Sequence, residues 1–462
     1  MRKWLLVVAA LMPVQPASGA DRNSPEGREA LEIYRSIVQI PTVKGRGQVP
    51  KMAKYLASKF RKAGFSSHDV EILPVGETAG LIVTYRGSGI KPPILFLGHM
   101  DVVEAKREDW QRDPFTFIEE DGYFFGRGTS DNKSGVAQLA AAFIELKKQG
   151  FKPNRDLILA FSGDEETDML STRALVTKLA PRRPEFAVNS DSGGGRADAS
   201  GKGLSFGVQV AEKTYANIEV SVHNPGGHSA RPRADNAIFE LAELLGNIRP
   251  YRFPVVVNAM TQSIVRDAAR QPNAKPGLEA ALAALATNPH DEQADALLSS
   301  DPRLAYSLRT TCVPTLLNGG HADNALPQKA TATINCRIFP GVPVESVEQE
   351  LAQAGRNPKA EWKVIGTPMA SAPSPENKEL FSAIARAVED RYPGVPVIPY
   401  MTAGATDGKH YRAAGIPTYG ANLEFSRPGE DTGAHGLNER VPVASFFESL
   451  DYWPKLMRLL SS

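Results

Sequence analysis

The 462-residue sequence has few cysteines and little net charge: two Cys, and 53 Lys and Arg against 52 Asp and Glu, for a formal net charge of +1. Two cysteines in so long a chain exclude a small fold held together by disulfides. The balanced charge gives no basis for a nucleic-acid or polyanion partner, because binding phosphates requires a surplus of basic residues. Hydrophobic residues make up 42% and charged residues 23%, which is ordinary for a globular protein and excludes collagen-like and disordered chains.

Long apolar runs are also missing, apart from a short one at the amino terminus. Arg2 and Lys3 precede an apolar segment, 4–14, and small residues follow at 18–20. This layout is typical of a secretory signal peptide, and the apolar segment is too short to span a hydrocarbon layer of roughly 30 Å. We therefore expect residues 1–20 to be removed and the product to be soluble and periplasmic or secreted, with no membrane-spanning segment.

The alternation of helical and strand-like segments predicts the fold class. Over residues 21–212, helical segments alternate with short, continuous apolar strands such as 93–97, as in a sheet covered by helices on both faces. Residues 213–368 instead read β-α-β-β-α-β, the pattern of a small two-layer α+β domain of ferredoxin-like topology. The first pattern returns over 369–462. We therefore predict a three-layer α/β/α catalytic domain in two pieces, with an α+β lid and dimerisation domain inserted between them.

Two features of the inserted domain stay open. An Ala-rich helical stretch at about 254–309 interrupts it, and its role cannot be read from the sequence. Cys312 and Cys336 lie in the two strands that flank the turn at Asn324. They could face each other across the hairpin and form a disulfide in an oxidising compartment, or remain free and buried.

Five polar segments combine glycine with acidic or histidine residues, and most of them follow a predicted strand. They are 98–101, 126–133, 163–166, 190–193 and 433–436. Open α/β sheets bind their ligands in loops at the carboxyl ends of strands. Each segment alone is ordinary, but carboxylates gathered at neighbouring strand ends would repel one another unless a cation lay between them.

Two histidines and three of the carboxylates in these segments would make a donor set that suits Zn²⁺, or less specifically Co²⁺ or Mn²⁺. The odd number of carboxylates is explained if one of them bridges two ions about 3.5–4 Å apart, each ion keeping a place for water or substrate. From the residues alone, a metal site and an ordinary wet, acidic surface both remain open.

The segments, taken in chain order, resemble the di-zinc aminoacylase and carboxypeptidase family, which includes aminoacylase-like deacylases, carnosinase-like dipeptidases, glutamate carboxypeptidase and succinyl-diaminopimelate desuccinylase. The matching motifs are GHMDVV, EDWQRDPF, DGYFFGRGTSDNK, SGDEE, SDSGG, GGHSARP, NALP and TGAHG, from His99 to His435. GHMDVV, EDW and GRGTSDNK look closest to the carboxypeptidase S-like branch, whose members also carry an enlarged inserted domain. The implied fold covers essentially the whole chain after residue 20.

The resemblance implies a role for each candidate metal ligand. His99 and Asp191 would hold one ion. Glu166 and His435 would hold the second, and Asp131 would bridge the two. We therefore expect two Zn²⁺ per subunit, with Co²⁺ or Mn²⁺ as alternatives.

Two further acidic residues are expected to act beside these ligands. Asp101, two residues beyond His99, would hydrogen-bond that imidazole and fix its tautomer. Glu165 would be the general base and acid: it would take a proton from a water that bridges the ions and pass it to the leaving nitrogen. No ligand or general base is substituted relative to the family pattern, which counts against an inactive member.

The inserted domain supplies the remaining candidates. The resemblance implies that His228 reaches into the partner subunit's site and steadies the oxyanion, so we expect a homodimer. Arg337 and Asn324 would hold the free carboxylate of the substrate, a task that suits the two-pronged guanidinium of Arg. Lys213 would be a further carboxylate contact. The alternatives are a helix-capping role for His228 and a plain surface position for Arg337.

Together these residues predict an exported di-zinc hydrolase that cleaves an amide or peptide bond next to a free carboxylate. Carboxypeptidase action on small peptides and deacylation of N-acyl amino acids are the same reaction at such a site, and the sequence does not decide between them. A catalytically inactive binding protein of the same fold and a metal-dependent hydrolase of esters or carbamates are the alternatives.

Overall fold

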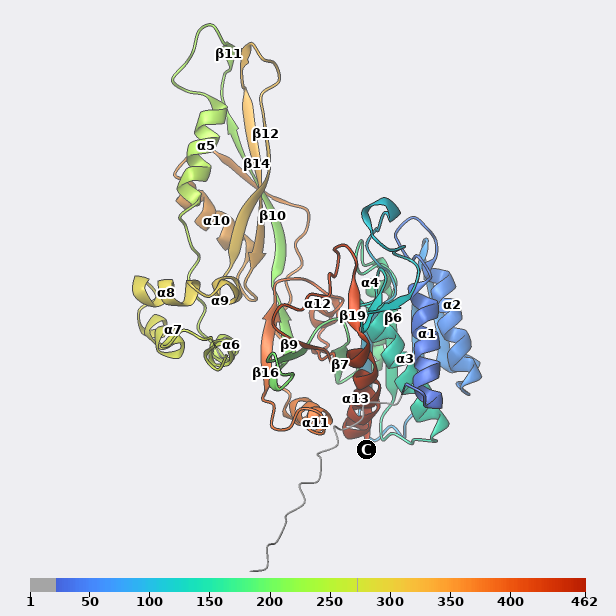
Figure 1. Ribbon diagram of the computed structural model, residues 1–462. Coiled ribbons are helices and arrows are strands. Elements are labelled where there is room, and N and C mark those ends of the chain that lie inside the picture. Colours follow the sequence, from blue (N-terminus) through green and yellow to red (C-terminus); the bar gives the residue numbers. More distant parts are fainter. Residues whose placement is uncertain (1–21, 272) are drawn as a thin grey trace, which may run out of the picture.

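The computed structural model describes residues 22–271 and 273–462, so the expected signal peptide lies outside the described residues. A large α/β body contains both ends of the described chain, and a second, elongated part projects from it (Figure 1). Among the described residues, none of the helices combines the length and the apolar character that crossing a bilayer requires.

A ten-stranded mixed sheet forms the centre of the body. Its main path runs β1 (Val70–Val75), β2 (Thr78–Tyr85), β6 (Leu157–Ser162), β3 (Ile94–His99), β7 (Phe186–Asn189), β17 (Thr418–Gly420), β9 (Gly203–Glu212), β8 (Gly194–Ala197) and β18 (Phe425–Ser426), and β16 (Val397–Thr402) pairs with β9 off this path. β3 is parallel to both β6 and β7. All three strands are fully buried, as their continuous apolar sequences predict.

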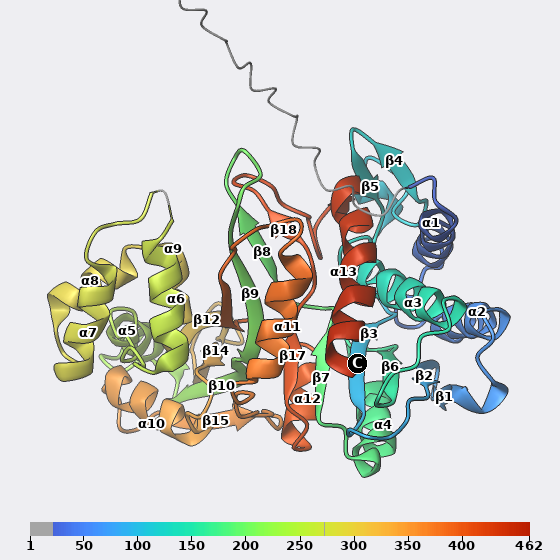
Figure 2. The same cartoon turned by 90° about the horizontal axis from the view of Figure 1, so that it is seen from below.

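Helices cover both faces of this sheet (Figure 2). Along β3, Ile94 and Phe96 pack into one apolar cluster, whereas Leu95 and Leu97 pack into another on the opposite face. The first face carries α1 (Pro25–Val38), α2 (Val49–Lys62), α3 (Lys133–Lys148), α11 (Lys378–Val388) and α13 (Val443–Ser461), and the second carries α4 (Leu170–Leu179) and α12 (Gly408–Ala413). The predicted three-layer α/β/α class is confirmed.

A small three-stranded sheet and three short 3₁₀ helices complete the body. The sheet has the order β19 (Arg440–Pro442), β5 (Tyr123–Phe125), β4 (Ile118–Glu120). The 3₁₀ helices are Ser67–Asp69, Arg107–Asp109 and Ala180–Arg182.

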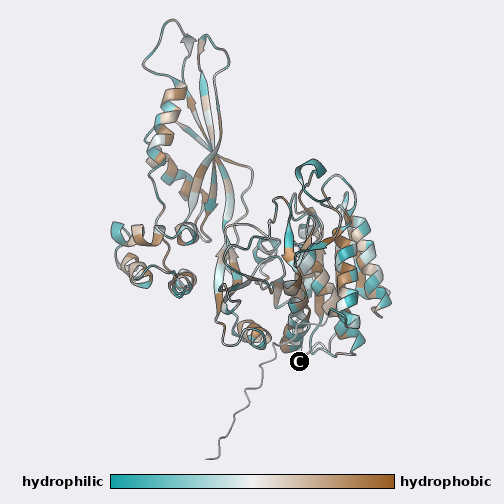
Figure 3. Cartoon of the chain, viewed as in Figure 1, coloured by the Kyte–Doolittle hydropathy of each residue, from teal (hydrophilic) through white to brown (hydrophobic). Residues whose placement is uncertain are grey.

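The projecting part, called the lid below, contains a four-stranded antiparallel sheet and two helices. The strand order is β12 (Thr311–Gly319), β14 (Lys329–Ile338), β10 (Thr214–His223), β15 (Glu361–Ile365). α5 (Ala237–Ile248) and α10 (Val344–Gly355) pack on this sheet around a separate apolar core, and Figure 3 shows hydrophobic residues along the strands and on these helices. The chain order β10-α5-β12-β14-α10-β15 is the predicted β-α-β-β-α-β. At the tip, β11 (Gly227–His228) pairs with β13 (Ala325–Leu326).

The Ala-rich stretch between α5 and β12 forms four helices, called the insertion below. They are α6 (Ala259–Ala269), α7 (Leu278–Thr287), α8 (Glu292–Ser299) and α9 (Pro302–Ser307). Although the sequence places them within the inserted domain, α6 contacts β16 and shares the apolar cluster of the body. Asp267 of α6 also pairs with Arg196 of β8 and with Arg303 of α9. The insertion is therefore held against the body by both apolar contacts and ion pairs.

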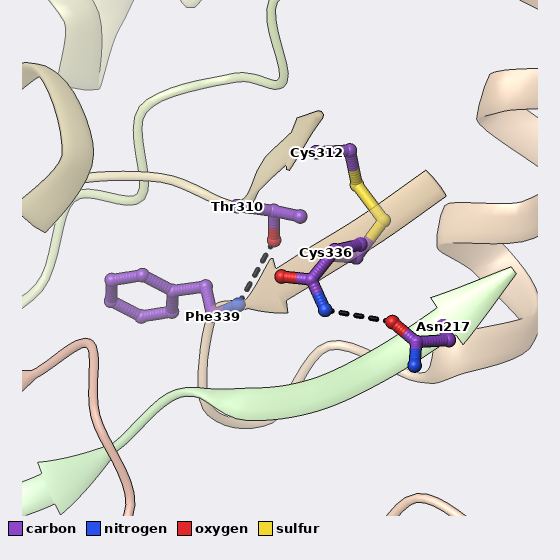
Figure 4. The surroundings of a disulfide bond; sticks show 6 residues. Asn217, Thr310, Cys312, Cys336 and Phe339 are labelled. Atoms are coloured by element: carbon purple, nitrogen blue, oxygen red, sulfur yellow. Dashed lines mark hydrogen bonds between the residues drawn. A yellow bond between two sulfur atoms is a disulfide. The ribbon is translucent and has the colours of Figure 1, made fainter. Parts of the chain in front are cut away.

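Cys312 and Cys336 form a disulfide, which decides the question that the sequence left open (Figure 4). The two residues are direct partners in the pairing of β12 with β14, with their Cα atoms 4.1 Å apart. Next to the bridge, the Phe339 N–H donates a hydrogen bond to Thr310 Oγ1 at 2.9 Å. The bridge therefore links an edge strand of the lid sheet to its neighbour.

Candidate metal centre

The parallel strands at the middle of the large sheet carry three of the candidate metal-binding segments. His99 is the last residue of β3, Glu165 and Glu166 follow β6, and Asp191 follows β7. Because β3 lies between β6 and β7 and runs parallel to both, the carboxyl ends of the three strands meet at one edge. Sheet order therefore gathers side chains that are nearly one hundred residues apart in the sequence.

The other two candidates come from loops that the small sheet brings together. Asp131 lies in the loop between β5 and α3, and His435 lies in the loop between β18 and β19. β19 pairs with β5 in an antiparallel fashion, so the loop that leaves β5 lies beside the loop that enters β19. This pairing places Asp131 and His435 on the same side of the centre.

Glu439 ties these two loops together. Its side chain is completely buried and pairs with the Arg127 guanidinium at 2.7 Å. It also accepts hydrogen bonds of 2.8–2.9 Å from three backbone N–H groups, those of Gly128, Ser130 and Asp131. Sequence reasoning missed this residue. The available signal was an acidic residue close behind the Gly-rich histidine loop, but nothing local shows that it turns inward.

The five predicted ligands converge in two groups that share Asp131. His99 Nε2 lies 2.8 Å from Asp131 Oδ1 and 3.4 Å from Asp191 Oδ1. His435 Nε2 lies 2.9 Å from Glu166 Oε1 and 3.1 Å from Asp131 Oδ2. Within each group the donor atoms all lie within 4.8 Å of one another. Each carboxylate oxygen of Asp131 thus faces a different histidine, the geometry expected of a bridging ligand.

The chemistry of this donor set fits divalent cations. Burial raises the pKa of Asp191 to about 7, and the negative charge of Asp131 adds to the rise. Burial likewise raises the pKa of Glu165 well above its usual value, and Asp191 contributes. Carboxylates crowded in this way are stabilised by a cation between them, and imidazole with carboxylate donors suits Zn²⁺, Co²⁺ or Mn²⁺.

Asp101 lies where it can position both His99 and the acidic loop. Its carboxylate oxygen Oδ1 is 3.5 Å from His99 Nδ1, while its backbone carbonyl oxygen is 3.1 Å from the same nitrogen. The carboxylate also accepts hydrogen bonds of 3.0 Å from the backbone N–H groups of Glu165 and Glu166. The contact to the acidic loop was not predicted, and it makes Asp101 a support for the Glu165 backbone.

Glu165 lies beside the candidate ligands, as its position next to Glu166 in the chain predicts. Its side chain is buried, and one of its oxygens belongs with His99 and Glu166 to a third group of donor atoms within 4.8 Å. Behind the centre lies Asp407, which sequence reasoning missed. Its buried carboxylate accepts hydrogen bonds from Ser162 Oγ at 2.5 Å and from Thr172 Oγ1.

His228 and Asn324 lie together at the tip of the lid. His228 is opposite Ala325 in the β11–β13 pair, and the Ser229 N–H donates to the Asn324 carbonyl oxygen at 2.9 Å. Figure 1 shows this tip at the end of the lid that is farthest from the body. Within one chain, neither residue is near the metal ligands.

Arg337 lies at the other end of the lid, near the body. Its guanidinium donates to the Ala403 carbonyl oxygen at 3.1 Å and stacks over the Tyr215 ring at 4.7 Å. The family resemblance predicts that Arg337 and Asn324 hold the substrate carboxylate together. The structure separates them within one chain, because β14 runs the length of the lid between them.

Lys213 is buried between β9 and β10, and its ammonium group donates hydrogen bonds to the backbone near the end of the insertion. Nζ donates to the backbone carbonyl oxygens of Arg309, at 2.6 Å, and of Tyr306. Burial lowers the pKa of Lys213 to about 8, and the positive charges of Arg337 and Arg309 add to this effect. That Lys213 contacts the substrate stays a prediction. In this structure its ammonium group donates hydrogen bonds to these two carbonyl oxygens instead.

Comparison with known proteins identifies the family to which the chain belongs. Residues 95–459 match the family model described as peptidase family M20/M25/M40. The chain is 26% identical over 449 residues to N-fatty-acyl-amino acid synthase/hydrolase PM20D1.1 of Danio rerio, covering 94% of this chain and 86% of that protein. It is 27% identical over 391 residues to probable carboxypeptidase S-like 2 of Dictyostelium discoideum, covering 79% and 71%.

A solved structure has the same fold. The M20 family metallo-carboxypeptidase Sso-CP2 of Sulfolobus solfataricus matches with a TM-score of 0.67 at 17% identity, covering 94% of this chain and 99% of that one. The family model spans most of the sequence and includes every candidate ligand from His99 to His435. The chain therefore belongs to peptidase family M20/M25/M40, and it is a hydrolase of that family, as its motifs predict.

Proposed function

We propose that the chain is a di-zinc hydrolase that cleaves an amide bond next to a free carboxylate. The proposal rests on the position of Asp131 between two groups of candidate ligands. One of its carboxylate oxygens lies 2.8 Å from His99 Nε2 and the other lies 3.1 Å from His435 Nε2. The names of the two relatives supply the substrate class, N-acyl amino acids for one and carboxypeptidase substrates for the other. Both are amides with a carboxylate on the leaving side.

The five candidate ligands would hold two metal ions. His99 with Asp191 and His435 with Glu166 would each hold one ion, and Asp131 would hold both. Divalent ions bound there would polarise the scissile carbonyl and make the attacking water more acidic.

Glu165 takes a proton from that water and delivers it to the leaving nitrogen. Asp101 keeps Glu165 in place through the hydrogen bond from its backbone N–H.

Arg337 is the candidate for binding the substrate carboxylate. Its guanidinium contacts a carbonyl oxygen and an aromatic ring, and among the described residues no acidic side chain pairs with it. It lies on the side of the lid that meets the body, so a carboxylate in the space between the two could reach it. A guanidinium without an anionic partner suits this task because it binds carboxylates through two parallel N–H groups.

Arg337→Ala should lower kcat/KM for a free-carboxylate substrate by about 100-fold, since it removes a charge-assisted, two-pronged contact. The same variant should hydrolyse the C-terminally amidated substrate as slowly as the wild type does. Steady-state kinetics on the matched pair of substrates measure both effects. Arg252→Ala, which changes an exposed arginine between α5 and the insertion, is the control. If Arg337→Ala still preferred the free carboxylate, this assignment would be wrong.

We also propose that the lid mediates a homodimer. β12 is an edge strand of the lid sheet, and its Val313, Leu316 and Leu317 side chains are 56%, 68% and 72% exposed. Phe239 of α5 is 70% exposed, and Ile238 of the same helix lies against the end of β12 at Gly319. An exposed apolar edge strand is a template for pairing with another chain. A second copy would cover it and could bring its His228 to this chain's metal centre.

The substrate class and the metal requirement can be tested together. We expect metal-loaded enzyme to hydrolyse dipeptides, N-acyl amino acids or both, to lose this activity on chelation, and to regain it with Zn²⁺. The same panel includes an ester and a carbamate of matched shape. Amide turnover that survives complete chelation would contradict the metal mechanism, and turnover of the ester or carbamate alone would contradict the amide assignment.

Export is a further part of the proposal. The signal-like residues 1–20 support it, and so does the Cys312–Cys336 bridge, because disulfides persist in oxidising compartments. Protein from the exported fraction should begin at Asp21 and should take up no alkylating reagent when it is denatured without reductant. After reduction it should gain two alkyl groups by mass spectrometry. Two alkylated thiols without reductant would show that the bridge is absent.

A further inference from the structure

A cavity of about 350 Å³ lies where the body meets the lid, and no candidate metal ligand lines it. Two of its walls are the segments that connect the body to the lid, 212–217 and 365–371. The other walls belong to the body, around the first turn of α4 and at α12. The cavity is therefore built from both parts of the molecule and from both connections between them.

Two cations in this cavity have no anionic partner. Arg173 projects from α4 and Lys409 from α12, and both line the cavity. Among the described residues, neither forms an ion pair with an acidic side chain. Lys213 lines the cavity as a third cation, and its ammonium is bound by two carbonyl groups. Carbonyl groups carry no net charge, so the charge of Lys213 also remains uncompensated.

The acidic residues of the cavity are already paired with other cations. Glu212 is buried and pairs with Arg412 at 2.6 Å. Asp168 pairs with Lys44 at 2.7 Å. Neither carboxylate is therefore available to neutralise the three lining cations, and the cavity carries an excess of positive charge.

His410 adds a polar group that lacks a partner. Its side chain is 7% exposed and lines the cavity, and no described residue forms a hydrogen bond with its ring. Burial, together with the nearby charges of Lys409 and Arg173, lowers the pKa of His410 to about 4. α12 packs against α4 and β17, and β17 has no charged residue. A neutral imidazole is therefore held between two cations, where an anion would stabilise all three groups.

We propose that this cavity binds a small oxyanion, a carboxylate or phosphate group, between Arg173, Lys409 and the His410 ring. The guanidinium and the ammonium supply charge-assisted hydrogen bonds, and the ring supplies another when it is protonated. Neither Arg337 nor any candidate metal ligand lines this cavity, although Arg337 stacks over the ring of Tyr215, which does. Because its walls include both connections to the lid, an anion bound there touches the segments on which the orientation of the lid depends.

The probes are inorganic sulfate, a tetrahedral stand-in for phosphate, and propionate, a simple carboxylate. Isothermal titration of the metal-loaded full chain should show saturable binding of at least one probe. The Arg173→Ala/Lys409→Ala variant should bind it at least about tenfold more weakly, because two charged donors are lost. Tighter binding of sulfate would assign a phosphate group, and tighter binding of propionate would assign a carboxylate.

Two control variants make the titration decisive. Lys178→Ala removes a cation of α4 that pairs with Glu71 outside the cavity, and it should bind like the wild type. Arg337→Ala removes a cation that stacks over the lining residue Tyr215 but does not itself line the cavity, so it should weaken probe binding much less than the double variant does. Thermal unfolding checks that each variant is folded. Equal binding by the wild type and the double variant, or no binding by either, would overturn the proposal.

The role of His410 has its own readout. An anion beside the ring favours the imidazolium form, so sulfate should bind more tightly as the pH falls from 7.5 to 5.5, while the charge of sulfate itself stays constant. His410→Gln should retain binding at pH 7.5 and lose most of this pH dependence. Asp168 and Glu212 face the same cavity but are present in both proteins, so the comparison isolates His410. An unchanged pH dependence in His410→Gln would remove the ring from the site.

Discussion

Glu165→Gln should lower kcat by roughly 1,000-fold while the chain keeps its full complement of metal ions, because an amide cannot accept the proton that general-base catalysis moves. The side chain is buried beside His99 and Glu166, and its backbone is held by Asp101. The substitution keeps the shape of the side chain and leaves every candidate ligand in place. Steady-state kinetics and metal analysis by atomic spectroscopy on the same sample measure the two quantities.

Glu166→Gln is the matched control for this prediction. It makes the same chemical change one residue further along the chain, at a side chain whose oxygen lies 2.9 Å from His435 Nε2. It should lose bound metal as well as activity, because an amide is a poorer ligand than a carboxylate. Wild-type turnover by Glu165→Gln, or loss of metal from it, would contradict the assignment of Glu165 as the base.

His228→Ala should lower kcat by about 100-fold in the homodimer, the size of effect expected when one donor to a developing oxyanion is lost. Within one chain His228 lies at the tip of the lid, far from the metal ligands (Figure 1). We therefore expect it to act on the partner's site. Activity should return in a mixed dimer of one His228→Ala chain and one Glu165→Gln chain, because the first chain's site then combines its own Glu165 with the partner's His228.

The mixed dimer is prepared by co-expressing the two chains with different tags and purifying on both. One of its two sites is intact, so it should recover about half of the wild-type kcat per dimer. Leu316→Asp, placed in both chains, puts charge on the exposed edge strand β12 and should give monomers without rescue. Light scattering checks the oligomeric state. A purified mixed dimer with no more activity than its parents would show that His228 does not act across the interface.

Much of the body could be predicted from the sequence, because its central strands are continuous apolar runs. The apolar run predicted as a strand at 93–97 corresponds to β3, and a second short run of mostly apolar residues, Phe186–Asn189, forms β7; both strands are fully buried. β8 was missed, since its sequence GGRA has no strand-like pattern. It forms a strand because β9 and β18 pair with it on either side, and such pairing leaves no trace in a four-residue stretch.

The residues of the candidate site were likewise only partly predictable from the sequence. The five polar segments could be found because glycine-flanked acidic and histidine residues follow predicted strands, but the five candidate ligands within them could be named only because the segments resemble a known family. Glu439 and Asp407 could not, because a buried carboxylate and an exposed one look alike in sequence. What distinguishes them is their set of partners, such as Arg127 for Glu439 and Ser162 for Asp407, which lie hundreds of residues away in the chain.

By itself, then, the sequence predicted the fold class, because the class depends on the local spacing of apolar residues, and its motifs predicted the candidate metal ligands through their resemblance to a known family. Only the tertiary structure decided which loops meet at Asp131, and that the insertion packs on the body. It also decided that Asn324 lies with His228 rather than with Arg337, and that the ammonium of Lys213 is bound by carbonyl groups. The physical reason is that these contacts depend on strand order and domain packing, which join residues that no local pattern relates.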